Sequence, residues 1–252
     1  MTTIEALAGL GPREATGEAF RQAADLVAEQ LSASGHGVWT QPFDVPAGNS
    51  WGIDVPAGTS VNVIADPPGF DQGQPHVVIG AHLDSVPQSP GAEDNASGVA
   101  VMLEMARMTA QRPAALPVRF IAFGAEEPRG EGDALHHFGS THHAASAGNV
   151  VAMVSLDRVG VPGDAVPVAF GGQGTPEIRD ALVETAPVPV DVQENRSSDH
   201  WSYEKAGIPA ARLGSISFSG YHSPADVPSV IDPAQLEATA DVVWAWLQAL
   251  EA

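Results

Sequence analysis

The sequence predicts an α/β fold, with a single α/β/α domain over residues 1–252 and a mostly parallel, mixed central sheet. Apolar runs that suit buried strands alternate along the chain with segments of helical periodicity, which is typical of a sheet covered by helices on both faces. A length of 252 residues fits one large domain, and no linker or change in composition divides the chain.

The expected elements follow from periodicity and from turn-forming residues. Apolar side chains recur at helical spacing over residues 12–34, residues 36–45 alternate like a strand, and residues 46–59 are rich in Pro, Gly and Asn and predict a loop. Further strands are expected at residues 60–65, 76–81, 117–123, 150–156, 166–170 and 208–213. Further helices are expected at residues 95–110, 176–184, 199–206 and 233–250.

The chain is strongly acidic, with 31 acidic against 11 basic residues and a formal net charge of −20. Nucleic acids and anionic membranes are therefore excluded as expected partners, because contacts to phosphate need Lys or Arg. We interpret the acidity as a contribution to solubility rather than as substrate steering. The composition leaves the oligomeric state open.

Cysteine is absent, which excludes disulfides and thiolate metal sites. Residues 1–7 lack the basic region and apolar core of a signal peptide, and no apolar run is long enough to span a bilayer. A cytoplasmic location is the expectation, and a secreted mature form is compatible with the same sequence.

Residues 80–98 hold the first chemically informative motif. His82 and Asp84 follow the apolar run 76–81, and Asp94 comes twelve positions after His82, at the start of a predicted helix. Ligand sites of open α/β sheets gather outside the carboxyl ends of the strands. Three further groups lie near similar strand ends: Glu126-Glu127, Asp157 and His222.

These residue types suit a site for two divalent metal ions. Catalytic zinc takes His nitrogens and carboxylate oxygens and keeps a position for water, and a pair of zinc ions needs a carboxylate that bridges them. Asp84 is expected to accept the second imidazole N–H of His82 and so to fix its tautomer. Of the two adjacent glutamates, one would bind metal and the other would stay free as a base. Each residue alone also has an ordinary structural explanation, such as an N-cap for Asp94. The hypothesis of a metal site therefore rests on the occurrence of all these residues together.

Six short stretches of the sequence match one protein family as a set. They are Gly80-Ala-His-Leu-Asp-Ser, Glu93-Asp-Asn-Ala-Ser-Gly, Phe123-Gly-Ala-Glu-Glu, Leu156-Asp157, Ser198-Asp-His and Tyr221-His-Ser-Pro-Ala-Asp. In these stretches the chain resembles the co-catalytic zinc aminopeptidases, which include bacterial leucine aminopeptidases and are related to glutamate carboxypeptidases and glutaminyl cyclases. The resemblance implies the zinc exopeptidase fold, of the phosphorylase/hydrolase-like type.

The same resemblance implies two zinc ions per chain and gives each ligand a role. His82 and Asp157 would bind one zinc ion. Glu127 and His222 would bind the other. Asp94 would bridge the two ions.

The remaining implied roles concern catalysis and substrate. Glu126 matches the family's general base, which acts on a water molecule that bridges the metals, and Tyr221 matches a tyrosine that donates to the oxyanion in some members. Arg196 is a weaker candidate for binding the substrate backbone. Ser198 and Asp199 lie in a segment that supports the metal ligands. The implied reaction is hydrolysis of the N-terminal residue from a peptide or an aminoacyl amide.

Three other functions stay open at this point. A carboxypeptidase or deacylase-type amidohydrolase shares similar motifs, glutaminyl cyclase uses the same fold with a single zinc, and a binding relative would keep the fold without catalysis.

The sequence also departs from the family after the glutamate pair, where a longer loop intervenes over residues 128–138. This loop and the segment after it carry four histidines: His136, His137, His142 and His143. We expect them to lie at the surface or to line a pocket, because the five-ligand set is already complete.

Overall fold

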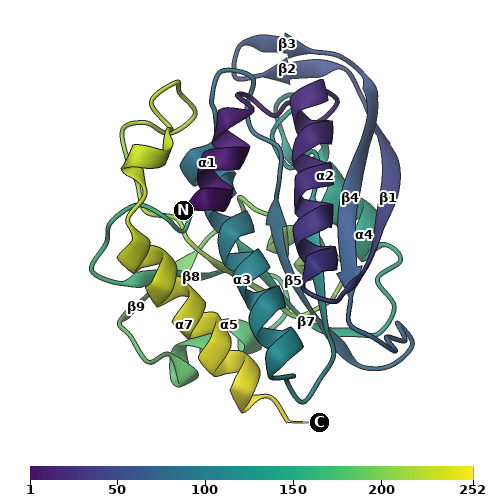
Figure 1. Ribbon diagram of the computed structural model, residues 1–252, viewed down its shortest axis with the longest axis vertical. Helices are drawn as coiled ribbons and strands as arrows, with labels where there is room; N and C mark the ends of the chain where they lie inside the picture. The colour runs from purple at the N-terminus through teal and green to yellow at the C-terminus, as the bar shows by residue number, and fades with distance from the viewer. Residues whose placement is uncertain (252) are drawn as a thin grey trace.

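The computed structural model describes residues 1–251, and its centre is an eight-stranded mixed sheet (Figure 1). In order across the sheet, the strands are β1 (Gly37–Val45), β4 (Gly58–Asp66), β6 (Val118–Phe123), β5 (His76–His82), β7 (Val150–Leu156), β10 (Ala210–Leu213), β8 (Val166–Phe170) and β9 (Val190–Glu194). The four central strands β6, β5, β7 and β10 are parallel, as are β8 and β9, and the other neighbours are antiparallel. The predicted α/β fold with a mixed sheet is confirmed.

Helices cover both faces of the sheet, as the sequence predicts. Within residues 1–251, the helices on one face of the sheet are α1 (Thr2–Gly9), α2 (Glu18–Ala33), α3 (Gly98–Gln111), α5 (Glu177–Thr185) and α7 (Pro233–Ala249). On the other side lie α4 (Phe138–Ala144) and α6 (His200–Lys205). Short helical turns at Ala92–Ser97, Asp133–Leu135 and Pro228–Val230 complete the connections.

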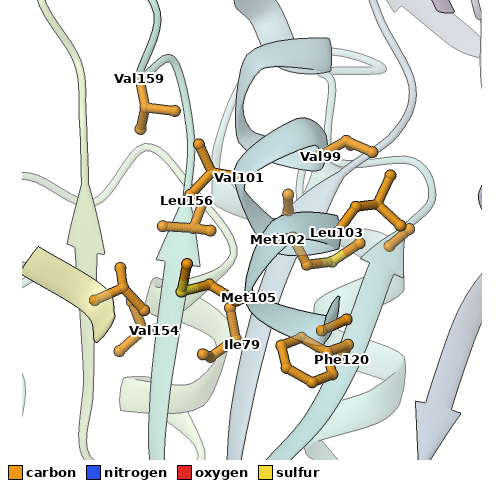
Figure 2. Packing of buried hydrophobic residues seen from close by; sticks show 14 of the residues in the cluster. Ile79, Val99, Val101, Met102, Leu103, Met105, Phe120, Val154, Leu156 and Val159 are labelled. Carbon is orange, nitrogen blue, oxygen red and sulfur yellow. The ribbon is translucent and has the colours of Figure 1, made fainter. Parts of the chain in front are cut away.

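Alternate side chains of the central strands point into two separate cores. In β5, Val77 and Ile79 join the core beneath α3, while Val78 joins the core on the opposite face. In β6, Phe120 belongs to the first core and Ile121 to the second. Figure 2 shows the first core, where side chains of α3 lie against those of the strands. Burying an aliphatic or aromatic side chain in this way stabilises the fold by about 1.5–3 kcal/mol.

The first long helix starts later than the sequence predicts. α2 begins at Glu18 rather than at residue 12, because Gly17 has an extended backbone with φ −79° and ψ 168°. The segment before it contains Arg13, which is fully buried and donates to the backbone carbonyls of Leu83 and Gly91, each at 2.9 Å. These bonds hold the connection between β5 and α3, which carries the first motif.

Several short elements differ from the prediction. Residues 46–59 contain a small hairpin of β2 (Gly48–Ser50) and β3 (Ile53–Val55), whose two turn residues Trp51 and Gly52 both have positive φ, as a type I′ turn requires. The prediction also lacks α1, α4 and β9, which have eight residues or fewer. Elements this short are stabilised by their packing against the rest of the fold, so the periodicity of their own sequence is too weak to predict them.

The two cores predict a clear difference between two isoleucines. Ile79→Ala is expected to lower the free energy of unfolding by about 2–5 kcal/mol, because Ile79 is fully buried between β5 and α3. The matched change Ile53→Ala, at a residue 41% exposed in the β2–β3 hairpin, should stay within about 1 kcal/mol. Urea denaturation followed by circular dichroism measures both, and equal losses would contradict the placement of the core.

Candidate metal centre

The five predicted metal ligands come together at one edge of the sheet. His82 ends β5 and Asp157 directly follows β7, so two neighbouring parallel strands bring them to the same edge. Glu127 follows β6, which lies on the other side of β5. Asp94 lies in the helical turn before α3, and His222 lies in the connection between β10 and α7. The sequence expectation that these residues share one edge is met in the structure.

Asp94 lies between the two histidines. Its Oδ1 is 3.1 Å from Nε2 of His82, and its Oδ2 is 3.0 Å from Nε2 of His222. The same nitrogens face the other two carboxylates. Nε2 of His82 is 3.4 Å from Oδ1 of Asp157, and Nε2 of His222 is 3.5 Å from Oε2 of Glu127. The donors therefore form two groups, and Asp94 belongs to both.

This donor set fits zinc. Two ligands bound at about 2.0–2.1 Å to a tetrahedral zinc ion lie about 3.3–3.4 Å apart. The separations within the two groups are close to this value, between 3.0 and 3.5 Å. Oε1 of Glu127 and Oδ1 of Asp157 are buried without a hydrogen-bond partner among residues 1–251, which is rare for polar atoms unless something else binds them.

The site holds more negative than positive charge. Although burial raises it, the interactions with His222 and His82 hold the pKa of Asp94 well below its ordinary value. Burial, together with the charges of Asp94 and Glu126, raises the pKa of Glu127 well above its ordinary value. These opposed pKa shifts indicate that the nearby positive charge stabilises one carboxylate but not both. A divalent ion at the donor atoms would supply the missing positive charge.

Asp84 does not contact His82 in the predicted way. Its carboxylate accepts the backbone N–H groups of Glu126 and Glu127, each at 3.1 Å, and its closer oxygen stays 3.8 Å from Nδ1 of His82. The backbone carbonyl of Asp84 lies 3.2 Å from that nitrogen and is placed to accept its hydrogen. A backbone carbonyl therefore orients His82, while the Asp84 side chain orders the backbone of the glutamate pair.

Glu126 faces a histidine from the longer loop. Nε2 of His137 lies 3.1 Å from Oε1 of Glu126, and both side chains are at most 10% exposed. The loop is fixed to the glutamate segment by its backbone, since the N–H of His137 donates to the carbonyl of Glu126 and the N–H of Phe138 donates to that of Ala125. Although burial lowers it, the charge of Glu126 raises the pKa of His137 above its ordinary value. The imidazole thus holds one oxygen of Glu126 in place.

The four histidines of this region lie in different environments. His136 and His137 line the cavity described below, and His142 is exposed on α4, as the sequence expectation allowed. The expectation of a surface or pocket-lining position is wrong for His143, which is buried near α6. Its Nδ1 lies 2.6 Å from the hydroxyl of Tyr203, and burial lowers its pKa to about 3. Within residues 1–251, the group with the spacing of a metal site belongs to the five-ligand set, so these histidines form no separate cluster there.

Ser198 and Asp199 are both fully buried. The hydroxyl of Ser198 is 2.9 Å from the hydroxyl of Ser155, which lies on β7 two residues before Asp157. Asp199 is fully buried, and burial together with the charge of Glu126 raises its pKa to about 7. The role of these two residues in supporting the ligand segment stays a prediction.

Tyr221 and Arg196 have different surroundings. Tyr221 lines the cavity, and its ring stacks on the imidazole of His222 with the ring centres 3.6 Å apart. Arg196 does not line the cavity, and its Nε donates to the backbone carbonyl of Gly171 at 2.7 Å. Of the two predicted substrate contacts, the structure brings only Tyr221 to the ligands.

Three residues outside the predicted set also shape the site. Nη2 of the buried Arg212 lies 3.1 Å from Oδ2 of Asp157. The carboxylate of Asp226 accepts the backbone N–H of Asp94 at 3.1 Å. Trp51, at the tip of the β2–β3 hairpin, lines the cavity. Asp226 ends the last matching stretch of sequence, so the motif could have identified it, but nothing local to the sequence marks Arg212 or Trp51.

Unusual backbone conformations concentrate at the site. Within residues 1–251, every non-glycine residue with positive φ either lines the cavity or precedes the glutamate pair: Trp51, Ala125, His137, Arg158 and His222. Such conformations cost of order 1–3 kcal/mol each and persist only where the surrounding structure holds them. Their concentration in one place is typical of a functional site.

A cavity of about 300 Å³ opens over these residues. Its wall combines the donor carboxylates and imidazoles with Glu126, Trp51, Tyr221 and the two arginines Arg158 and Arg212. A larger hollow of about 580 Å³ lies near the start of β6 and is lined mostly by Pro, Ala and Gly residues. The chemistry of the lining therefore identifies the smaller cavity as the functional one.

Two curated relatives show how far the sequence similarity extends. The chain is 33% identical over 206 residues to the aminopeptidase YwaD of Bacillus subtilis, which covers 74% of this chain and 44% of that protein. It is 30% identical over 226 residues to leupeptin-inactivating enzyme 1 of Streptomyces exfoliatus, covering 83% of this chain and 45% of that protein. The chain thus spans less than half the length of these two relatives.

Two earlier expectations stay predictions at this point. One is the single domain over residues 1–252, and the other is the cytoplasmic location. Across residues 1–251, the structure contains no helix with the length and apolar character that crossing a membrane requires.

Solved structures share the whole fold. A zinc aminopeptidase from Bacillus subtilis, BSAP, matches 97% of this chain and 92% of its own with a TM-score of 0.84 at 22% identity. A glutaminyl cyclase from Bacteroides thetaiotaomicron matches 99% of this chain and 96% of its own with a TM-score of 0.82 at 20% identity. The sequence pattern of peptidase family M28 covers residues 62–247, which include all five predicted ligands. The resemblance seen in the sequence motifs is confirmed, and the chain belongs to peptidase family M28.

Proposed function

We propose that the chain is an aminopeptidase that uses two zinc ions to remove the N-terminal residue from peptides or aminoacyl amides. The observation that carries this proposal is the position of Asp94, which offers one oxygen to the group of His82 and the other to the group of His222. The names of the relatives support it, since one is an aminopeptidase and one solved structure is a zinc aminopeptidase.

The metal roles follow the two donor groups. His82 and Asp157 would hold one zinc ion, Glu127 and His222 would hold the other, and Asp94 would bind both. When bound, zinc supplies Lewis acidity toward a water molecule and toward the scissile carbonyl.

Glu126 acts as the general base in this proposal. Its backbone is fixed by Asp84 and its Oε1 by His137, so the carboxylate is held at the cavity wall beside the metal donors. A carboxylate held in this way takes a proton from the attacking water and returns it to the leaving amine.

In this proposal, Tyr221 stabilises the charge that develops on the carbonyl oxygen. Burial, together with the charge of Asp94, raises the pKa of Tyr221 above its ordinary value, so the hydroxyl stays protonated near neutral pH. A protonated hydroxyl at the cavity wall donates a hydrogen bond to an oxyanion.

The shape and charge of the cavity favour a chain end over a chain interior. A volume of about 300 Å³ is small for a binding site and accommodates only a short piece of a peptide. The carboxylates beside the metal donors attract a positively charged amine, which a free peptide N-terminus carries and an internal peptide bond lacks.

The metal assignment predicts the zinc content of the purified protein. The zinc-loaded chain is expected to hold about two zinc ions, and His222→Ala about one, because the substitution removes a donor from one group only. Mass spectrometry of the metals measures both, with His142→Ala on the exposed face of α4 as the matched control. A wild-type value near one would contradict the two-ion assignment, and a single-zinc cyclase acting on N-terminal glutamine would then be the alternative to assay.

The base assignment predicts a loss of turnover without a loss of metal. Glu126→Gln should lower kcat on leucine p-nitroanilide by about 10²–10⁴-fold, since the amide cannot accept the proton, and should leave zinc content unchanged. Glu131→Gln, at an exposed position in the same loop, is the matched control. Near-normal turnover in the Glu126 variant overturns the assignment.

The contact between His137 and Glu126 predicts a positioning effect. His137→Leu should lower kcat about tenfold or more and leave KM and zinc content nearly unchanged, because the variant frees the Glu126 carboxylate to rotate. His137→Gln keeps an N–H donor and should recover part of the loss, while His142→Leu should act like the wild type. Equal losses in the Leu and Gln variants would show that the role of His137 is only structural.

A further inference from the structure

Arg158 places a guanidinium group in the wall of the cavity. It directly follows the ligand Asp157, and its φ of 60° turns the chain sharply at that point. Nη2 donates to the backbone carbonyl of Ile216 at 3.1 Å, and Nε is buried without a hydrogen-bond partner. The side chain of Arg158 is therefore held by a hydrogen bond to the backbone of Ile216, and some of its N–H groups have no acceptor within residues 1–251.

No carboxylate among residues 1–251 forms an ion pair with Arg158 within 4.0 Å, whereas Arg212, the other arginine in the cavity wall, pairs with Asp157 at 3.1 Å. Glu93 interacts with Arg158 at longer range, but its carboxylate accepts the backbone N–H of Gly160 at 2.8 Å instead. A partly buried guanidinium without an anionic partner is uncommon, because charged groups taken from water are usually paired.

The guanidinium also lies close to the metal donors. Its central carbon is 3.9 Å from the ring centre of Tyr221, and the same ring stacks on the imidazole of His222 at 3.6 Å. One face of a ring cannot hold both groups at these distances, so the ring of Tyr221 lies between them. A single aromatic ring thus separates Arg158 from the predicted metal ligand His222.

We propose that Arg158 binds a carboxylate of the substrate, so that the chain prefers substrates with an acidic group next to the scissile bond. The planar guanidinium and a carboxylate form paired, charge-assisted hydrogen bonds that a neutral amide cannot match. This carboxylate has two sources in a peptide: the side chain of an N-terminal Asp or Glu, and the C-terminus of a dipeptide. The inference rests on the proposed aminopeptidase activity.

Matched substrates separate these two sources. The first pair is the aminomethylcoumarin amides of Asp and Asn, which differ only in the charge of the first side chain. The second pair is the dipeptide Leu-Gly and its C-terminal amide, which differ only in the terminal carboxylate. For each pair, kcat/KM is measured with zinc-loaded wild type, Arg158→Gln, Arg158→Lys and Arg112→Gln. Arg112 is exposed at the end of α3 and forms no ion pair within 4.0 Å among residues 1–251, so its variant controls for the change in net charge.

The wild type is expected to favour the acidic member of one pair by about tenfold or more, which corresponds to about 1.4 kcal/mol. Arg158→Gln should bring that ratio near one by lowering kcat/KM on the acidic member, Arg158→Lys should keep part of the ratio, and Arg112→Gln should keep all of it. The pair that shows the preference identifies the source of the carboxylate.

Three other results would contradict one of the two proposals. Equal rates on both members of each pair, in the wild type and in Arg158→Gln, would overturn the role of Arg158 and leave the aminopeptidase proposal intact. Loss of the neutral and the acidic substrate alike in both Arg158 variants would show that the guanidinium only supports the ring of Tyr221. Absence of hydrolysis of all four substrates and of leucine p-nitroanilide by the zinc-loaded wild type would instead overturn the aminopeptidase proposal itself.

Discussion

Burial of carboxylates at one edge of the sheet is the constraint on which the rest of the structure depends. Asp84, Asp94, Glu126, Glu127 and Asp157 are each at most 7% exposed, although isolated buried charges are strongly unfavourable. The neighbouring structure satisfies them by different means. Backbone N–H groups bind Asp84, the histidines face Asp94, and an arginine pairs with Asp157. Oε1 of Glu127 and Oδ1 of Asp157 keep no hydrogen-bond partner among residues 1–251, and both belong to the donor set at which a cation would bind.

The loops around the site are held by the same kind of interaction. The guanidinium of Arg13 binds carbonyls on both sides of the connection after β5, and the carboxylate of Asp226 accepts the backbone N–H groups of Glu93 and Asp94. These bonds act on backbone groups, so they fix the path of the loops rather than single side chains. Rigid loops of this kind can maintain the strained positive-φ residues that aim His137 and His222 into the cavity.

The sequence predicts well which residues meet at this edge of the sheet, because strand ends and metal-binding residue types are local features. His82 and Asp157 follow apolar runs that become β5 and β7. The partner of Asp84 is less predictable, since its choice between an imidazole and two backbone N–H groups depends on how the segment after β6 folds back. Trp51 and Arg212 reach the cavity only through tertiary packing, so no local pattern identifies them.

The order of the donor residues along the chain also bears on how the protein is made. His82 comes from the first third of the sequence, and His222 comes from the connection before the last helix. A ribosome adds residues one after another, so His82 and Asp94 are made well before His222 can complete the set. A site with all five donors can therefore form only after the chain has been made as far as His222.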